Sequence, residues 1–204
     1  MFFFKVSDKY IVSLISKNGC STVAIQSHCY NCNEDINKYK HLEYDHLYGH
    51  WSGNFIYDFS IDYTKVHNYP NQKVVAIFRD PIERYMSIWG TSIVKHPNKN
   101  DFHDNLLQVK NHFDNNIGLN HHYCPQYMFY DFDKIDIFVE LKDYPKFCEE
   151  NNIPWIMINK NNNSEYKKLV PTEEQKQIIK EIYNKDYILL NKIRNSNKLY
   201  IPKQ

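Results

Sequence analysis

The feature that most constrains the fold is the stretch from Ile11 to Gln26, where a strand-like run meets a helix-like run across a tight turn. The apolar, β-branched letters predict a strand over residues 9–16 and a helix over residues 21–30. Lys17-Asn-Gly19 forms the turn between them. The N–H groups and the positive dipole end of a helix that starts after such a turn suit a phosphate or a sulfate.

The side-chain types in this turn also suit an anion. Lys17 adds a mobile positive charge, and Ser21 and Thr22 add hydroxyl donors at the helix start. Gly19 lets the backbone approach an anion closely. A plain strand-to-helix turn with an ordinary N-cap would have the same sequence pattern. A second element is therefore needed before this turn points to a ligand.

Along the rest of the chain, short apolar runs alternate with helical patterns. Beyond the first turn we expect strands over residues 73–78, 135–140 and 153–158, an edge strand with irregular loop over 41–55, and helices starting at Pro81, Phe102, Tyr144 and Pro171. The alternation predicts a single α/β domain, residues 1–204, with a mainly parallel central sheet flanked by helices. Ligands of such sheets bind at the carboxyl ends of strands. If their strands are neighbours, Lys17 and Arg79 share that edge.

The second anion-binding element begins at Arg79, which follows the apolar run 73–78 directly. Pro81 suits the first turn of a helix, and Ser87 lies about two helical turns further on. A guanidinium and a hydroxyl that converge on one group suit a terminal phosphate. A structural ion pair of Arg79 with Asp80, or one made by Arg84, would produce the same sequence pattern.

Composition excludes several classes of protein. The net charge is +1 with 24% charged residues, which argues against a general nucleic-acid binder. The 42% apolar and 16% aromatic residues indicate a folded chain. The apolar start Met1-Phe-Phe-Phe-Lys5 is too short for a signal peptide or a membrane span, so we expect a cytoplasmic protein without a membrane anchor.

Five cysteines, an odd number, do not indicate a disulfide framework. Cys29 and Cys32 form a CxxC beside His28, but no second pair follows at zinc-ribbon spacing. We therefore expect free thiols here, with a metal site as the alternative.

Together, the two anion-binding elements resemble the sulfotransferase superfamily that uses 3′-phosphoadenosine 5′-phosphosulfate (PAPS), particularly its carbohydrate sulfotransferases, with a uronyl 2-O and Golgi-type likeness. Ser16-Lys17-Asn-Gly-Cys-Ser-Thr22 is similar to the 5′-phosphosulfate loop of that family. Val74-Val-Ala-Ile-Phe-Arg79-Asp-Pro-Ile-Glu-Arg84-Tyr-Met-Ser87 is similar to its 3′-phosphate element, an apolar strand followed by R-[DH]-P-x-x-R-x-x-S.

Two weaker similarities follow in the order expected for the family. His122-Tyr-Cys-Pro-Gln126 resembles the H-W-x-P-Q of the family, with Tyr123 in place of tryptophan. The stretch from Thr172 to Leu190 resembles its C-terminal helix. The chain departs from Golgi members of the family in lacking their N-terminal membrane anchor, which leaves the compartment and the acceptor open.

The resemblance implies a P-loop-like fold of the sulfotransferase type, with PAPS as co-substrate, 3′-phosphoadenosine 5′-phosphate (PAP) as product and no metal. It implies 5′-phosphosulfate contacts by Lys17, Asn18, Gly19, Cys20, Ser21 and Thr22, and 3′-phosphate contacts by Arg79 and Ser87. The transfer is an in-line displacement at sulfur. A lysine and helix-terminal N–H groups stabilise the charge that builds on the bridging oxygen of the leaving phosphate. Residues 160–164 match the loop that closes over the nucleotide.

The acceptor hydroxyl, which the resemblance places on a carbohydrate, needs a general base. Tyr48-Gly-His50-Trp51 resembles the H-G-H segment of uronyl 2-O-sulfotransferases, in which a histidine takes this role, and His50 matches its second histidine. An imidazole with a pKa of ~6.5 is largely neutral near pH 7. The alternative candidates for the general base are Glu43, Asp45 and His122. Tyr48, Trp51 and Tyr123 could stack on a sugar ring, but plain packing is the more common role of such residues.

Two other functions remain open from the sequence. A metal-dependent phosphoryl transferase would use Asp80 at the end of an apolar strand, but the first turn lacks G-x-x-x-x-G-K-[ST] and Asp80 runs directly into Pro81. A binding protein could keep the nucleotide site and perform no transfer.

Overall fold

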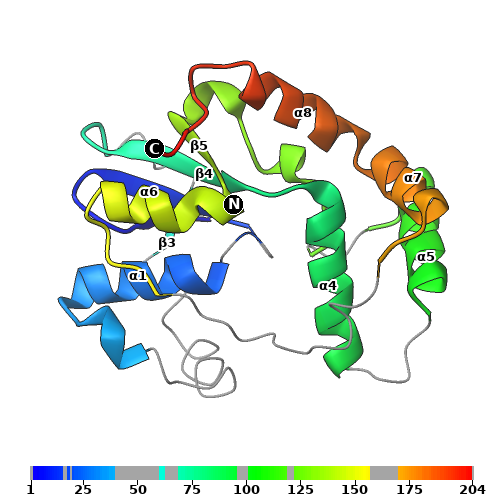
Figure 1. Ribbon diagram of the computed structural model, residues 1–204, viewed down its shortest axis with the longest axis horizontal. Coiled ribbons are helices and arrows are strands. Elements are labelled where there is room, and N and C mark those ends of the chain that lie inside the picture. The colour runs from blue at the N-terminus through cyan, green and yellow to red at the C-terminus, as the bar shows by residue number, and fades with distance from the viewer. Residues whose placement is uncertain are drawn as a thin grey trace. The chain divides into compact units, whose positions relative to one another are not determined.

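The computed structural model describes residues 2–15, 18, 20–39, 60–62, 69–95, 101–118, 122–156 and 170–203. The chain divides into two compact units (Figure 1). Unit 1 consists of Met1–Phe78, Tyr130–Lys160 and Ser196–Gln204, and unit 2 of Arg79–Phe129 and Asn161–Asn195. Both units are therefore built from separate stretches of the chain. The single domain expected over residues 1–204 stays a prediction.

Unit 1 contains a five-stranded sheet in the order β3-β1-β2-β4-β5. The strands are β1 (Phe2–Lys5), β2 (Tyr10–Leu14), β3 (Ser60–Asp62), β4 (Lys73–Phe78) and β5 (Ile137–Glu140). β2, β4 and β5 pair in parallel, whereas β1 is antiparallel to both β2 and β3. The predicted α/β class is thus confirmed, with a mixed sheet in which β1 runs against the other strands.

Because β2 and β4 are neighbours in the sheet, the two candidate anion-binding elements begin close to each other. The two strands pair in parallel, with Val12 opposite Val75, so they end at the same edge of the sheet. This meets the condition on which the expectation of a shared edge depended.

Both faces of the sheet are buried. On one face, α1 (Cys20–Cys32) and α6 (Tyr144–Glu150) contribute Val23 and Phe147 to a core that also contains Val12, Val75 and Val139. On the other face, the Phe138 ring meets Tyr130 and Phe132 at centroid distances of 6.0 and 5.5 Å. This double coverage explains why the β4 sequence is continuously apolar.

Short 3-10 helices and one paired segment complete unit 1. The 3-10 helices are η1 (Ile36–Tyr39), η5 (Phe132–Lys134) and η6 (Leu141–Asp143). Beside β5, the Phe138 N–H donates to the Lys198 carbonyl (2.8 Å), and the Tyr200 N–H donates to the Phe138 carbonyl (2.9 Å). Residues 198–200 therefore cover the edge of β5 that faces away from β4.

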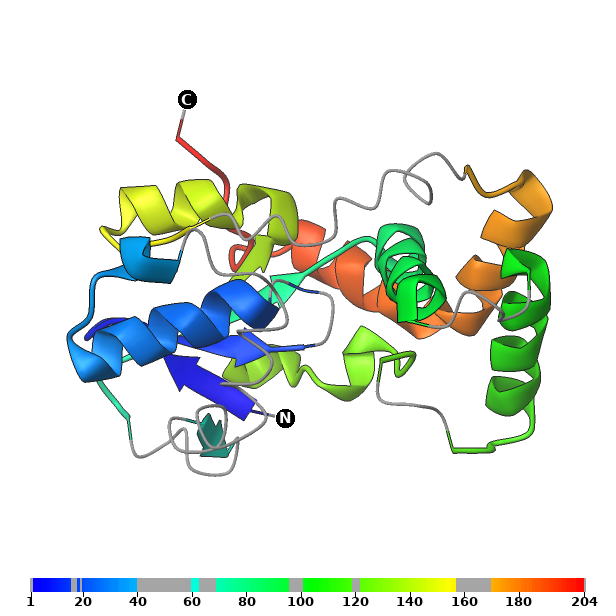
Figure 2. The same cartoon turned by 90° about the horizontal axis from the view of Figure 1, so that it is seen from below.

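Unit 2 is helical, with α4 (Pro81–Lys95), α5 (Phe102–Asp114), α7 (Glu173–Ile182), α8 (Asn184–Arg194) and the 3-10 helix η4 (Gln126–Met128). α7 lies against α4 and α5 (Figure 2). The core of unit 2 combines aromatic and aliphatic side chains, and within it the Phe102 ring meets Tyr85 and Trp89 at centroid distances of 5.7 and 5.0 Å. A helix was expected to start at Pro171, and α7 begins at Glu173, where the Thr172 hydroxyl and the Gln175 side chain form a capping box.

Several expectations were wrong. Residues 153–156 are not a strand: Pro154 lacks an N–H, its carbonyl accepts from Gln26 (3.0 Å), and Ile153 and Ile156 are buried without strand pairing. The stretch expected as one C-terminal helix breaks at Tyr183 into α7 and α8. β1 and β3 were not anticipated. In the part of the chain that the structure describes, no helix is long and apolar enough to cross a membrane.

Candidate anion-binding elements

The turn that follows β2 is held by Asn18. Its backbone N–H donates to the Ile15 carbonyl (3.0 Å), and its buried side-chain amide donates to the Ile77 carbonyl at the end of β4 (2.9 Å). α1 begins two residues later at Cys20, and Thr22 is half-buried in its first turn. The chain after β2 is therefore tied to β4 at the carboxyl edge of the sheet, and a helix starts there, as the letters predicted.

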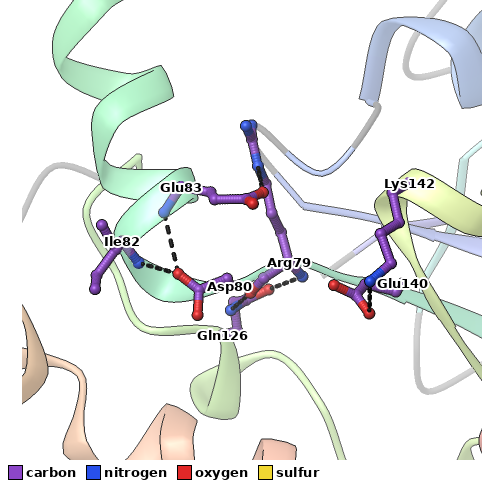
Figure 3. A network of polar contacts seen from close by, with 7 residues as sticks. All are labelled: Arg79, Asp80, Ile82, Glu83, Gln126, Glu140 and Lys142. Carbon is purple, nitrogen blue, oxygen red and sulfur yellow. Dashed lines mark hydrogen bonds and ion pairs between the residues drawn. The ribbon is translucent and has the colours of Figure 1, made fainter. Parts of the chain in front are cut away.

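Arg79 stands between β4 and α4, and the Gln126 side chain binds its backbone. The Arg79 N–H donates to Gln126 Oε1 (3.0 Å), and Gln126 Nε2 donates to the Arg79 carbonyl (2.8 Å). The Arg79 side chain is 24% exposed, and its Nε lies 3.3 Å from Glu83 Oε2 (Figure 3). Arg79 thus presents a partly exposed guanidinium on a fixed backbone.

Asp80 caps α4. Its Oδ1 accepts from the N–H groups of Ile82 (2.8 Å) and Glu83 (3.2 Å), and its carbonyl accepts from the Arg84 N–H (2.9 Å). An N-cap with proline at the next position is a strong helix start. This use of Asp80 favours a helix cap over the carboxylate ligand that a phosphoryl transferase would need.

Arg84 is the second arginine of the R-D-P-x-x-R-x-x-S motif, and the residue is only 1% exposed. It donates to the carbonyls of His122 (3.0 Å) and Cys124 (2.9 Å), which belong to the H-x-x-P-Q motif. Gln126, the last residue of that motif, accepts a hydrogen bond from the Arg79 N–H. The two motifs are therefore a single hydrogen-bonded assembly.

Helix α8 completes this assembly. The buried carboxylate of Asp186 accepts from the N–H groups of Gln126 (2.9 Å) and Tyr127 (2.8 Å), and the Tyr183 hydroxyl donates to the Tyr123 carbonyl (2.9 Å). Burial raises the pKa of Asp186, against the opposing effect of these N–H groups and of the Arg84 charge. We call Arg79, Arg84, Gln126 and Asp186 the Arg79 network.

Sequence reasoning identified Arg79 and missed the roles of Gln126 and Asp186. The Pro-Gln pair of the second motif was the one available signal for Gln126, and no local pattern marks Asp186. Ser87 lies half-buried in α4, as expected for a residue of that helix. His122 uses its carbonyl in the Arg79 network, and the Tyr123 hydroxyl donates to Asn105 (3.2 Å), which is a packing role.

Other predicted site residues lie outside the described part of the chain. They are Lys17, Gly19, Glu43, Asp45, Tyr48, His50, Trp51, residues 160–164 and the whole segment 41–55. For Ser21 the structure gives only its place in the first turn of α1.

The five cysteines, all within the described ranges, form no disulfide bond. The expectation that Cys29 and Cys32 hold no metal stays a prediction. Cys32 is exposed at the end of α1, with its Sγ 3.7 Å from His28 Nδ1, whereas Cys29 is buried. Burial raises the pKa of Cys29, and likewise that of Cys148, to about 11. Over the described ranges, no group of three His, Cys, Asp or Glu side chains could hold a metal ion.

These environments predict a difference in thiol reactivity. In the folded protein at pH 8, N-ethylmaleimide should modify Cys32 at least about a hundredfold faster than Cys29 or Cys148. The thiolate is the reacting form, and burial of Cys29 and Cys148 both disfavours their thiolates and blocks access of the reagent. Mass spectrometry of timed digests measures this, and adding urea should remove the difference. Equal labelling of Cys29 and Cys32 without denaturant would contradict the buried position of Cys29.

The chain as a whole was also compared with known proteins. No family model, curated protein or solved structure matches it.

Proposed function

We propose that this chain is a PAPS-dependent sulfotransferase with a P-loop-like fold, which moves a sulfuryl group to a hydroxyl acceptor on a carbohydrate. The observation that carries the proposal is the Arg79 network. Two motifs that resemble sulfotransferase motifs lie 38 to 47 residues apart and are hydrogen-bonded to each other through Arg84 and Gln126. These contacts between the two motifs support the proposal.

The turn after β2 supports the 5′ half of the proposed nucleotide site. β2 and β4 end at the same edge of the sheet, Asn18 ties the turn to Ile77, and α1 starts there. The N–H groups at a helix start favour an anion, and Lys17 would add its charge. We propose that the 5′-phosphosulfate binds here and that Arg79, with Ser87, binds the 3′-phosphate.

The proposed reaction is a single displacement. The acceptor oxygen forms a bond to sulfur while the bond between sulfur and the bridging oxygen of the 5′-phosphate breaks, and PAP leaves with the electron pair. Lys17 stabilises the charge on that oxygen. His50 takes the proton of the acceptor hydroxyl as general base.

Arg79→Ala tests the nucleotide assignment. We expect the wild-type protein to bind PAP more tightly than adenosine 5′-phosphate (AMP), which lacks the 3′-phosphate. The variant should lose about 10- to 100-fold in PAP affinity and little in AMP affinity, because a charge-assisted hydrogen bond to phosphate contributes about 1.5–3 kcal/mol. Isothermal titration calorimetry measures both affinities.

Glu83→Gln is the matched control, because it removes the ion-pair partner of Arg79 and keeps the arginine. It should retain the preference for PAP. An equal loss of PAP and AMP affinity in Arg79→Ala would refute the assignment of Arg79 to the 3′-phosphate.

Transfer itself is tested with labelled PAPS and a panel of glycans and small alcohols. Sulfation of a glycan hydroxyl supports the proposal. Tight PAP binding without transfer to any acceptor would indicate a nucleotide-binding protein instead. Magnesium-dependent activity in which ATP outcompetes PAPS would indicate a phosphoryl transferase.

A further inference from the structure

We propose that Gln126 is a positioning residue for Arg79: its side-chain amide fixes the backbone from which the guanidinium reaches the 3′-phosphate, and Asp186 of α8 fixes Gln126 in turn. This inference rests on the proposed function. It adds to it a residue that touches no substrate and yet sets the preference for a 3′-phosphorylated nucleotide.

The contact between Gln126 and Arg79 has the form of a strand pairing made by a side chain. Oε1 accepts from the Arg79 N–H (3.0 Å) while Nε2 donates to the carbonyl of the same residue (2.8 Å). Arg79 lies outside the bounds of both β4 and α4. The amide therefore fixes the peptide groups on both sides of Arg79 at a point where neither element does so.

Gln126 has a defined orientation of its own. Its residue is 1% exposed, and its backbone N–H is bound by Asp186. The two partners on Arg79 also decide which way the amide points, because a flipped amide would set N–H against N–H and oxygen against oxygen. The direction of Arg79 is thus determined by α8 through Gln126.

A misplaced guanidinium should bind phosphate poorly even though its charge is unchanged, because bidentate recognition depends on direction. Loss of the Gln126 contacts should therefore lower the preference for PAP over AMP. A residue that only stabilised the fold would lower the melting temperature and leave this preference unchanged.

Gln126→Glu makes the test specific, because a neutral carboxyl group reproduces the amide. Its O–H can donate to the Arg79 carbonyl and its C=O can accept from the Arg79 N–H, whereas the ionised form turns an oxygen lone pair toward that carbonyl. Burial keeps such a carboxyl neutral to a higher pH than usual. Gln126→Met removes both hydrogen bonds at every pH.

The experiment measures PAP and AMP affinities of wild type, Gln126→Met and Gln126→Glu by calorimetry from about pH 5 to about pH 8, where a raised carboxyl pKa is crossed. Each preference is divided by the wild-type preference at the same pH, which cancels the ionisation of the nucleotide. We expect Gln126→Met to lose at least about tenfold throughout. Gln126→Glu should lose as much at high pH and regain the wild-type preference at low pH.

Gln26→Met is the matched control. Gln26 is 2% exposed. Its Nε2 donates to the Pro154 carbonyl (3.0 Å) and to Cys148 Sγ (3.3 Å), and its Oε1 accepts from the Tyr144 hydroxyl (2.7 Å). It belongs to unit 1 and should leave the preference for PAP unchanged.

The outcomes separate this inference from the proposed function. If wild type prefers PAP and folded Gln126→Met does so equally, the positioning role is wrong and the function stands. If Gln126→Met does not fold, the pH series of Gln126→Glu decides alone, and a preference that stays low at low pH overturns the inference. If wild type itself shows no preference for PAP, the proposed function fails and the positioning role fails with it.

Discussion

Replacing Arg84 by methionine should lower the free energy of unfolding by about 3–5 kcal/mol, because removing one partner from a buried charged network leaves the others uncompensated. Methionine keeps much of the side-chain volume. The substitution removes the hydrogen bonds that Arg84 donates to the carbonyls of His122 and Cys124, and it removes the positive charge near the buried carboxylate of Asp186. Urea denaturation followed by circular dichroism measures the loss.

The loss should also depend on pH in a defined direction. Burial already raises the pKa of Asp186, and removing Arg84 raises it further. A carboxyl with a higher pKa in the folded than in the unfolded state binds its proton more tightly when folded. Its stabilising contribution is therefore complete below the unfolded pKa and is lost as the pH rises through the folded pKa. The deficit of Arg84→Met should grow from about pH 4 upward.

Arg194→Met serves as the control, because Arg194 is exposed at the end of α8 and should change stability by less than about 0.5 kcal/mol. Adding Asp186→Asn to Arg84→Met should cost much less than Asp186→Asn alone. Additive losses would show that Arg84 and Asp186 are independent.

Replacing Lys17 by alanine should lower turnover with PAPS about 10²–10³-fold while PAP affinity changes less than about tenfold. The reason is that the lysine charge matters most at the oxygen that becomes negative as the sulfur bond breaks. Turnover at saturating PAPS and calorimetric binding of PAP provide the two measurements.

Lys9→Ala is the matched control for Lys17→Ala. Lys9 is exposed just before β2 begins and should affect neither quantity. A loss of PAP affinity as large as the loss of turnover would mean that Lys17 only binds the nucleotide and takes no part in the displacement.

Local patterns predicted the elements whose stability is local. β4 has the bounds that were expected, residues 73–78, and the helix expected from Pro171 begins two residues later, at Glu173. The break at Tyr183 was not expected; the hydroxyl of that residue donates to the Tyr123 carbonyl, 60 positions away in the chain. β1 likewise depends on partners, β2 and β3, and its short apolar run could not show them.

The same distinction applies to the Arg79 network. Arg79 was singled out because it follows an apolar strand pattern directly and stands just before Pro81, a typical helix start. The capping role of Asp80 was not predicted. Gln126 lies 47 positions from Arg79, and Asp186 lies 60 positions from Gln126, so no periodicity connects them. A motif could mark Gln126, and its partner became visible only in three dimensions.

The segment that covers β5 sets an order of events during synthesis. Phe138 cannot pair on its outer side until Lys198 and Tyr200 have left the ribosome, although every strand of the sheet has emerged long before. Exposed strand edges pair readily with those of other chains. On a crowded polysome, each nascent chain therefore exposes the unpaired outer edge of β5 for the time needed to translate about sixty codons. During that time a chaperone can shield this edge from other chains.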